Sequence, residues 1–160
     1  MTEDEGLAAA SPECVDAIER ALEDIAGPGS TVLATLWATV DIERTLADRG
    51  VEAREAGIDT LLGARVVVVP GEPPGPPVAI VEPATEGRLA ATLARYGEGP
   101  AGRYVAVSDD LEAAMARAAA GGVAVSRVGD GPFGRSMLVL LGSVTGPHLI
   151  LCDPAVPSTS

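Results

Sequence analysis

Three side chains that could do chemistry lie in or beside strand-like runs in the second half of the chain: Arg103, His148 and Cys152. An arginine can hold a carboxylate, an enolate or a phosphate. His148 is the single histidine, and its ordinary pKa lies near neutrality, so it can act as an acid or a base. Together these residue types suggest oxyanion stabilisation and proton transfer.

Each of the three residues also has a structural interpretation. Arg103 is as readily explained by an internal salt bridge as by a ligand contact. His148 follows a Gly-Pro turn, which favours a partly exposed residue at a strand end. Cys152 lies in an apolar run with no base beside it, which favours a small core residue over a nucleophile.

Composition excludes several classes of function. The chain has 160 residues, 47% of them hydrophobic and 21% charged, which predicts a single globular domain. All eleven basic residues are arginine, so Schiff-base and P-loop lysines are absent. A net charge of -12 opposes binding to nucleic acid or anionic membrane, and only 2% of residues are aromatic, too few for stacking single-stranded bases. We expect neither partner.

The cysteines and the N-terminus indicate a compartment. Two cysteines, Cys14 and Cys152, make no disulfide framework, and the first residues are acidic where a secretory signal is basic. Apolar runs are much shorter than the roughly 20 residues that a membrane helix needs. We therefore expect a soluble, cytoplasmic protein.

The chain divides into an N-terminal part and a main domain. Residues 1–29 are predicted to form a tail and an amphipathic helix, since Ser11-Pro12-Glu13 is a helix-start signal and Val15, Ile18, Leu22 and Ile25 recur at helical spacing. Residues 30–160 form the main domain. The helix is expected to cap this domain or to help pair two subunits.

The main domain contains an internal duplication. Three pairs of segments match in the same order, at shifts of 69, 70 and 71 residues: 40–43 with 109–112, 65–69 with 135–139, and 78–84 with 149–155. Such ordered self-similarity indicates two copies of one module. The modules span about 31–84 and 102–155, joined by a linker helix at about 86–97.

Each copy has the pattern of a βαβββ unit. The first copy is predicted to have strands near 31–39, 55–60, 64–70 and 77–82, with a helix near 41–49. The second is predicted to have strands near 102–107, 123–127, 136–142 and 147–153, with a helix near 110–120. The fold class is therefore α+β, with two tandem modules whose mixed sheets curl around a cavity, plus the N-terminal helix.

The sequence motifs of the two modules resemble those of the vicinal oxygen chelate superfamily, which includes glyoxalases, methylmalonyl-CoA epimerases and bleomycin-type resistance proteins. The resemblance covers about 31–154 and rests on Val40-Asp41-Ile42-Glu43, on its repeat at 108–114, and on Gly131-Pro132-Phe133-Gly134-Arg135. It implies a ligand cavity inside the curled sheets and, commonly, a homodimer, to which the N-terminal helix could contribute contacts.

The resemblance also implies which residues face the cavity. The family's metal enzymes place a His, Gln or Glu on each of four strands, and counting back seven residues from Asp41 and Asp110 gives Ala34 and Arg103, while the final strands give Ala79 and Ile150. None of these four can ligate a divalent ion, so we predict no metal and no other cofactor.

Alternation along the strands then gives the remaining cavity residues. The predicted catalytic residues are Arg103 and His148. Ligand contacts are predicted for Ala34, Leu36, Ala79, Val81, Val105, Ile150, Cys152 and Arg135. The faces of Arg65 and Arg135 are not determined by the sequence. Trp37 is expected to face the helices, and Glu82 and Asp153 are expected to be solvated or to act as caps.

Three functions compete at this point. The first is a metal-independent enzyme of small-molecule or secondary metabolism that isomerises, cyclises or dehydrates a largely apolar, oxygen-bearing, polyketide-like substrate. The second is a protein that binds or sequesters an apolar metabolite or antibiotic without catalysis. The third is a module whose cavity is filled by its own side chains. The first is favoured.

Overall fold

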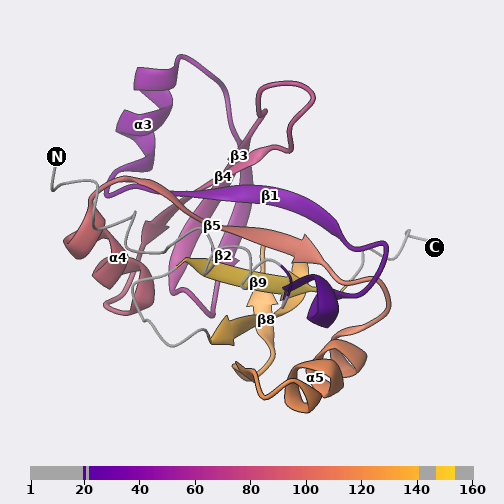
Figure 1. Ribbon diagram of the computed structural model, residues 1–160. Helices are drawn as coiled ribbons and strands as arrows, with labels where there is room; N and C mark the ends of the chain where they lie inside the picture. The colour runs from indigo at the N-terminus through magenta and orange to yellow at the C-terminus, as the bar shows by residue number, and fades with distance from the viewer. Residues whose placement is uncertain (1–19, 21, 141–146, 154–160) are drawn as a thin grey trace, which may run out of the picture.

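A computed structural model describes residues 20, 22–140 and 147–153 of the chain. Its strands form one sheet in the order β2-β3-β4-β1-β5-β9-β8-β6, and β7 pairs with β8 beside this path (Figure 1). Each half of the order comes from one half of the sequence. The predicted α+β fold with two βαβββ modules is confirmed.

The two modules are built from corresponding elements. The first comprises β1 (Thr31–Ala38), α3 (Ile42–Arg49), β2 (Arg54–Asp59), β3 (Ala64–Val69) and β4 (Val78–Pro83). The linker helix is α4 (Arg88–Tyr96). The second module comprises β5 (Gly99–Ala106), α5 (Leu111–Ala120), β6 (Ala124–Val125), β7 (Gly129–Gly131), β8 (Gly134–Leu140) and β9 (His148–Cys152).

The same pairing pattern occurs in both modules. β1 pairs with β4 in parallel, and β5 pairs with β9 in parallel, while the remaining ladders within each module are antiparallel. The first strands of the two modules, β1 and β5, pair antiparallel and join the halves into one curved sheet.

The module helices begin at equivalent caps. The side chains of Asp41 and Asp110 accept hydrogen bonds from backbone N–H groups three residues later in α3 and α5. At the ends of β4 and β9, Glu82 and Asp153 accept the first helical N–H groups, each at 2.9 Å. The predicted capping role of Glu82 and Asp153 is confirmed.

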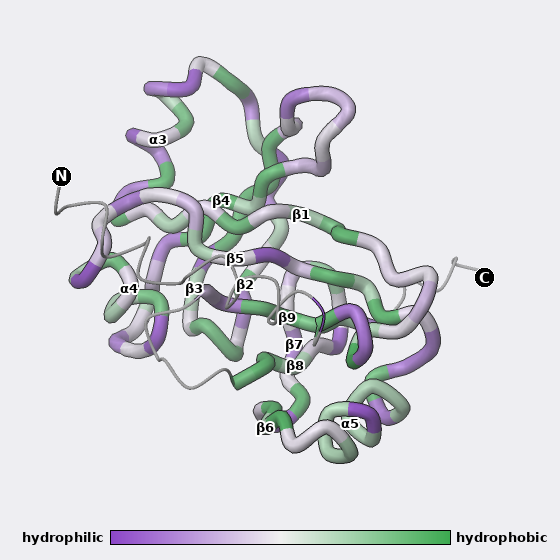
Figure 2. Tube along the Cα trace, in the orientation of Figure 1, coloured by the Kyte–Doolittle hydropathy of each residue, from purple (hydrophilic) through white to green (hydrophobic). Residues whose placement is uncertain are grey.

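Alternating strand residues divide the core between the two faces of the sheet. We call the cluster on the concave face the inner cluster; both modules and α4 contribute to it. On the convex face, one cluster packs under α5 and another, with Trp37 at its edge, under α3. The strands carry most of the hydrophobic segments (Figure 2). Trp37 faces a helix, as predicted.

The curled sheet closes on itself at β2 and β7. Thr60, directly after β2, donates its N–H to the Asp130 carbonyl of β7 at 2.9 Å, and Asp130 donates its N–H to Thr60 Oγ1 at 3.0 Å. The strand β7 was not predicted, because its three residues are too short and too glycine-rich for a strand pattern.

The N-terminal prediction is only partly covered by the structure. The predicted helix and Cys14 fall mainly on residues 1–19 and 21, which lie outside the described residues, while residues 22–26 are helical. Within the described part of the chain, no helix combines the length and the apolar character needed to cross a membrane.

Candidate functional site

Most of the predicted cavity residues lie on the concave face. The inner cluster contains six of them: Ala34, Leu36, Ala79, Val81, Ile150 and Cys152. All are almost completely buried, and together with Leu89 of α4 they fill much of the interior of the curled sheet. Their contact with a ligand stays a prediction.

Arg103 does not face the interior, so its predicted orientation is wrong. Its neighbour Tyr104 belongs to the inner cluster, and Arg103 projects from the convex face beside Val32 and Val105. The alternation along β5 is therefore the reverse of that expected.

A one-residue difference between the modules causes this error. Thr39 donates its N–H to the Val81 carbonyl as Val107 donates to the Cys152 carbonyl, so Thr39 and Val107 are equivalent. The cap Asp41 follows Thr39 by two residues, whereas Asp110 follows Val107 by three. Counting back from the caps therefore reverses the assignment of faces on β5.

The correct equivalents follow from the ladder registers. Leu36 pairs with Ala79 and Tyr104 pairs with Ile150, so Tyr104 takes the place of Leu36. Gly102 consequently takes the place of Ala34.

Two further predicted ligand contacts lie on the convex face. Val105 packs in the cluster under α5. Arg135 donates to Asp153 at 2.8 Å and to Glu112 at 2.7 Å, and these hydrogen bonds raise the pKa of its guanidinium. The orientation predicted for Val105 is thus wrong because of the same one-residue difference, while Arg135, whose face the sequence does not determine, pairs with Glu112 and Asp153 on the convex face.

His148 faces inward as predicted, but it is only 1% exposed and is not a strand-end residue in solvent. Its Nε2 lies 2.6 Å from Thr92 Oγ1 of α4. Burial, with the positive charge of Arg88, lowers the pKa of His148 to about 4. The imidazole is therefore neutral at pH 7 and held by a buried partner.

Cys152 lies deep in the inner cluster with 1% exposure. Burial, followed by the negative charges of Asp59 and Asp153, raises the pKa of its thiol to about 12. The thiol is protonated at neutral pH, as expected for a core residue.

The chemistry of the interior centres on Asp59 and Tyr104, neither of which was singled out from the sequence. Asp59 ends β2 and is fully buried; its Oδ2 accepts the Tyr104 hydroxyl at 2.7 Å. Its Oδ1 accepts the N–H groups of Leu61 and Leu62, each at 2.9 Å. The Phe133 ring lies against Tyr104 with centroids 5.1 Å apart.

Burial dominates the electrostatics of this pair. It raises the pKa of Asp59 although three hydrogen-bond donors act in the opposite direction. The pKa of Tyr104 is well above its usual value, first because of burial and then because of the Asp59 charge. A buried carboxyl beside a phenol is the kind of perturbed pair found at acid-base sites.

A buried hydroxyl lies beside this pair. Ser136 Oγ is fully buried and has no hydrogen-bond partner among the described residues. A Cβ atom on Gly131 would lie 3.1 Å from Ser136 Oγ and 3.7 Å from Asp59 Oδ2, so both groups flank this glycine. We call Asp59, Tyr104, Phe133, Ser136 and Cys152 the Tyr104 cluster.

Sequence reasoning could have found part of this cluster if the inward-facing and outward-facing residues of β5 had been assigned correctly. Asp59 lay in the predicted strand near 55–60, whose faces were not assigned, and Tyr104 was placed on the outer face by the reversed alternation along β5. Ser136 begins an apolar run, where a lone serine resembles a strand-start residue.

The residues present do not fit the divalent metal that the resemblance implies. Ala34, Ala79 and Ile150 have no donor atom. Gly102 adopts φ +146, and a Cβ there would lie 1.9 Å from the His148 carbonyl oxygen, so the backbone leaves no room for a ligating side chain.

One acidic group in the described chain has metal-like spacing: Asp41, Glu43 and Glu82 on the outer side, with ligand atoms within 4.8 Å of one another. Asp41 and Glu82 cap α3, and Glu43 pairs with Arg65 at 2.8 Å. The capping hydrogen bonds and the ion pair explain why these three carboxylates lie close together.

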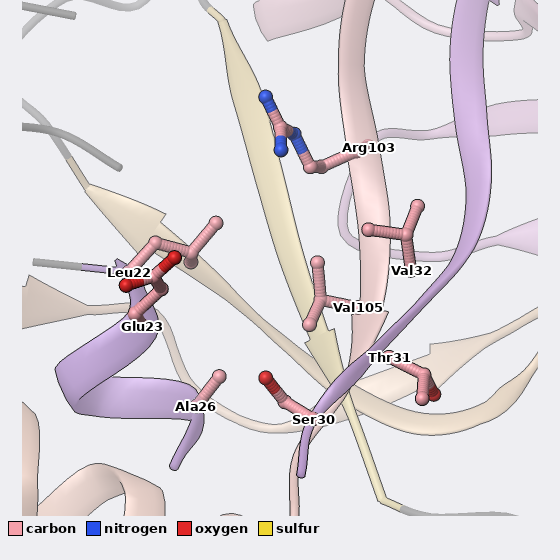
Figure 3. Close-up of a pocket in the computed structure, with 8 residues that line it drawn as sticks. All are labelled: Leu22, Glu23, Ala26, Ser30, Thr31, Val32, Arg103 and Val105. Atoms are coloured by element: carbon pink, nitrogen blue, oxygen red, sulfur yellow. The ribbon is translucent and has the colours of Figure 1, made fainter. Parts of the chain in front are cut away.

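A shallow pocket of about 170 Å³ lies on the convex face where residues 22–26 cross β5 (Figure 3). It is lined by Leu22, Glu23, Ala26, Ser30, Thr31, Val32, Arg103 and Val105. Figure 3 shows Arg103 and Val105 projecting from β5 on the side of the helical turn. The pocket is therefore separated by the sheet from the Tyr104 cluster.

Comparison with solved structures identifies the fold. Methylmalonyl-CoA epimerase from Mycobacterium tuberculosis is similar with a TM-score of 0.66 and 19% identity, over 79% of this chain and 89% of that chain. A hypothetical protein from Bacillus halodurans has a TM-score of 0.66 and 15% identity, over 83% of this chain and 100% of that chain. Streptomyces coelicolor methylmalonyl-CoA epimerase, in complex with 2-nitronate-propionyl-CoA, has a TM-score of 0.62 and 21% identity, over 78% of this chain and 98% of that chain. A scan against protein-family models and a search of curated proteins give no match.

The class of protein defined by these observations is a paired βαβββ half-barrel. It is the vicinal oxygen chelate fold, as the internal duplication and its motifs predicted. At these identities the similarity establishes the fold and leaves the chemistry to the residues of this chain.

Proposed function

We propose that the protein is a metal-independent enzyme of small-molecule metabolism that isomerises an uncharged, largely apolar, carbonyl-bearing substrate inside the curled sheet. The observation that carries this proposal is the fully buried Asp59 carboxyl with the Tyr104 hydroxyl 2.7 Å away. Asp59 takes the proton-transfer role for which the sequence favoured His148. Tyr104 takes the oxyanion role for which it favoured Arg103.

The surroundings of Asp59 suit proton transfer. Its Oδ1 is fixed by two backbone N–H groups, so Oδ2 is the oxygen directed at Tyr104 and the interior. A pKa raised by burial makes the carboxylate a stronger base, and it brings the carboxyl closer to the pH at which an acid-base group is most effective.

The proposed step is proton abstraction beside a carbonyl. Ionised Asp59 accepts the proton, the C–H electron pair forms a C=C bond, and the carbonyl π electrons move to oxygen. The Tyr104 hydroxyl turns from Asp59 to donate to the resulting enolate oxygen. In a substrate with a β,γ-double bond the enolate is a conjugated dienolate, and Asp59 then returns the proton to its γ carbon, which completes an isomerisation with no added reagent. Cyclisation or dehydration would begin from the same enolate.

The interior favours an uncharged substrate. The side chains that fill it are mostly apolar, and Arg103 and Arg135 project from the opposite face of the sheet. A carboxylate or phosphate placed there would face the Asp59 charge in a site of low dielectric.

Deuterium exchange tests this proposal with a defined pair of probes. Ethyl 2-methylacetoacetate is neutral, and 2-methylacetoacetate is its anionic counterpart. In D2O, exchange at C2 of the ester, followed by proton NMR, should exceed the rate in buffer alone, and the anion should not respond. Asp59→Asn should lower the protein-dependent rate by about 100-fold or more. Tyr104→Phe should lower it by a similar factor.

Two control variants separate this site from the residues favoured by the sequence. Arg103→Ala and His148→Gln should retain most of the exchange activity, because Arg103 projects from the opposite face of the sheet and His148 Nε2 bonds to Thr92 of α4. Loss of activity in these variants with retention in Asp59→Asn would contradict the proposal. Ester binding without exchange, unchanged by Asp59→Asn, would instead support a binding or sequestration protein.

A further inference from the structure

The curled sheet is closed by hydrogen bonds between two residues and not by a strand ladder. We call this contact, between Thr60 and Asp130, the β2–β7 seam. It consists of three hydrogen bonds: Thr60 N–H to the Asp130 carbonyl, Asp130 N–H to Thr60 Oγ1, and Thr60 Oγ1 to the same carbonyl at 2.7 Å. Two of the three depend on one exposed hydroxyl group.

The strands on both sides of the seam are weakly held. β2 is an edge strand in which only Asp59 is buried, and its ladder with β3 is irregular between Glu55 and Gly57. Ile58, next to the seam, is 54% exposed. β7 pairs with β8 over only three residues. Segments with few buried contacts and short ladders open at the lowest free-energy cost.

The seam lies directly over the Tyr104 cluster. Asp59 immediately precedes Thr60, and Gly131 immediately follows Asp130 and packs against Ser136 Oγ. Gly129 completes the close approach, because a Cβ there would lie 2.9 Å from both Thr60 Oγ1 and Leu61 Cδ2. Separating β2 from β7 would therefore uncover the acid-base pair.

The cover over His148 is held differently. Leu89 and Leu93 of α4 pack in the inner cluster, with Leu89 fully buried, and Thr92 bonds to His148 beneath the helix. Lifting α4 would expose apolar surface as well as break hydrogen bonds, which makes this route more costly.

We propose that the β2–β7 seam is the entrance to the interior, and that it opens by local separation of β2 from β7 while the rest of the sheet stays folded. As the route by which substrate reaches Asp59 and Tyr104, it rests on the proposed function. As a mode of opening, it is tested without any turnover.

Cys152 provides the readout, because it lies inside the inner cluster and its thiol is reached only when the interior opens. The experiment uses the full chain with Cys14→Ser, so that Cys152 is its single thiol. Labelling by N-ethylmaleimide is followed by intact mass. The global unfolding rate of each variant is measured in parallel by the fluorescence of Trp37, the single tryptophan.

Thr60→Val removes the two hydroxyl-dependent hydrogen bonds and keeps the backbone one. Since a net hydrogen bond contributes a factor of about five to an equilibrium constant, labelling should accelerate by about tenfold to thirtyfold. Gly129→Ala provides a second variant, because its methyl group would collide with the Leu61 side chain and push β7 away from β2. This variant should also accelerate labelling. Thr92→Val is the matched control at α4 and should label at the parent rate.

Faster labelling in both seam variants, without an equal rise in their unfolding rates, supports the entrance. Three results overturn it: no acceleration in Thr60→Val and Gly129→Ala, an equal or larger acceleration in Thr92→Val, or labelling that follows global unfolding in every variant. Because labelling needs no substrate, an inactive protein with a functional seam would contradict only the proposed catalysis.

Discussion

Lowering the pH from 6.5 to 4 should destabilise the protein through His148. The folded state holds this imidazole neutral at 1% exposure, with Thr92 Oγ1 at 2.6 Å and the charge of Arg88 opposing protonation. Unfolding releases it to an ordinary environment. The pKa is therefore about 4 in the folded protein, against the ordinary value of 6.5 for a free histidine side chain.

The sign and size of the effect follow from linkage. Between pH 6.5 and 4 His148 is protonated in the unfolded chain but neutral in the folded protein. The free energy of unfolding therefore falls as the pH falls through this window. Above pH 6.5 the contribution is fully present. A pKa difference of about 2.5 at 1.36 kcal/mol per unit gives a loss of about 3 kcal/mol, a large part of a typical domain's stability.

The assay compares urea unfolding of the wild type and His148→Gln in steps from pH 7.5 to 4. Glutamine can still hydrogen bond to Thr92 but does not titrate. Carboxyl groups titrate alike in both proteins, so the difference between the two curves isolates the histidine. The single imidazole also gives its folded pKa directly by NMR. A pKa near 6.5, or parallel stability curves for the two proteins, would refute the reasoning.

Three further substitutions test the interior. Tyr104→Phe should lower the free energy of unfolding by about 1–3 kcal/mol in chemical denaturation, since the Asp59 carboxyl loses a donor; an unchanged value would show that their hydrogen bond contributes nothing. Gly102→Ala should destabilise by more than about 2 kcal/mol or prevent folding, since its methyl group would meet the His148 carbonyl; a fully stable variant, seen by thermal unfolding, would argue against the described β5–β9 approach. Ser136→Ala should be neutral or slightly stabilising, since it removes a buried hydroxyl with no partner among the described residues; destabilisation by about 1 kcal/mol or more would reveal a hydrogen bond.

The architecture could be predicted because its signals are local and repeated. Each module presents a capping aspartate, a helix and an apolar strand with arginine at its start, and the same features recur about 70 residues later. Arg65 and Arg135 show how closely the copies correspond, since each pairs with a glutamate near the start of its module helix, Glu43 or Glu112. Hydrophobic alternation then places most inner residues correctly.

The candidate site could not be predicted because it depends on which β5 residues face the interior and on contacts between residues distant in the sequence. One additional residue before Asp110 exchanges the two faces of β5, and no periodicity within that short strand reveals it. Asp59 and Tyr104 lie 45 positions apart and meet only because the sheet curls until β2 reaches β7. Composition and spacing carry no information about that closure.

The internal duplication has lost its symmetry inside the curled sheet. Leu36, Val66 and Val81 of the first module occupy the places that Tyr104, Ser136 and Cys152 occupy in the second. A two-fold symmetric interior would surround both faces of a planar molecule alike. At these three places the first module offers only hydrocarbon and the second offers hydroxyl and thiol groups, while the Asp59 carboxyl comes from the first module, so the two halves of the interior differ in their chemistry. The two sides of a bound molecule would therefore meet different groups, a difference that two identical modules could not provide.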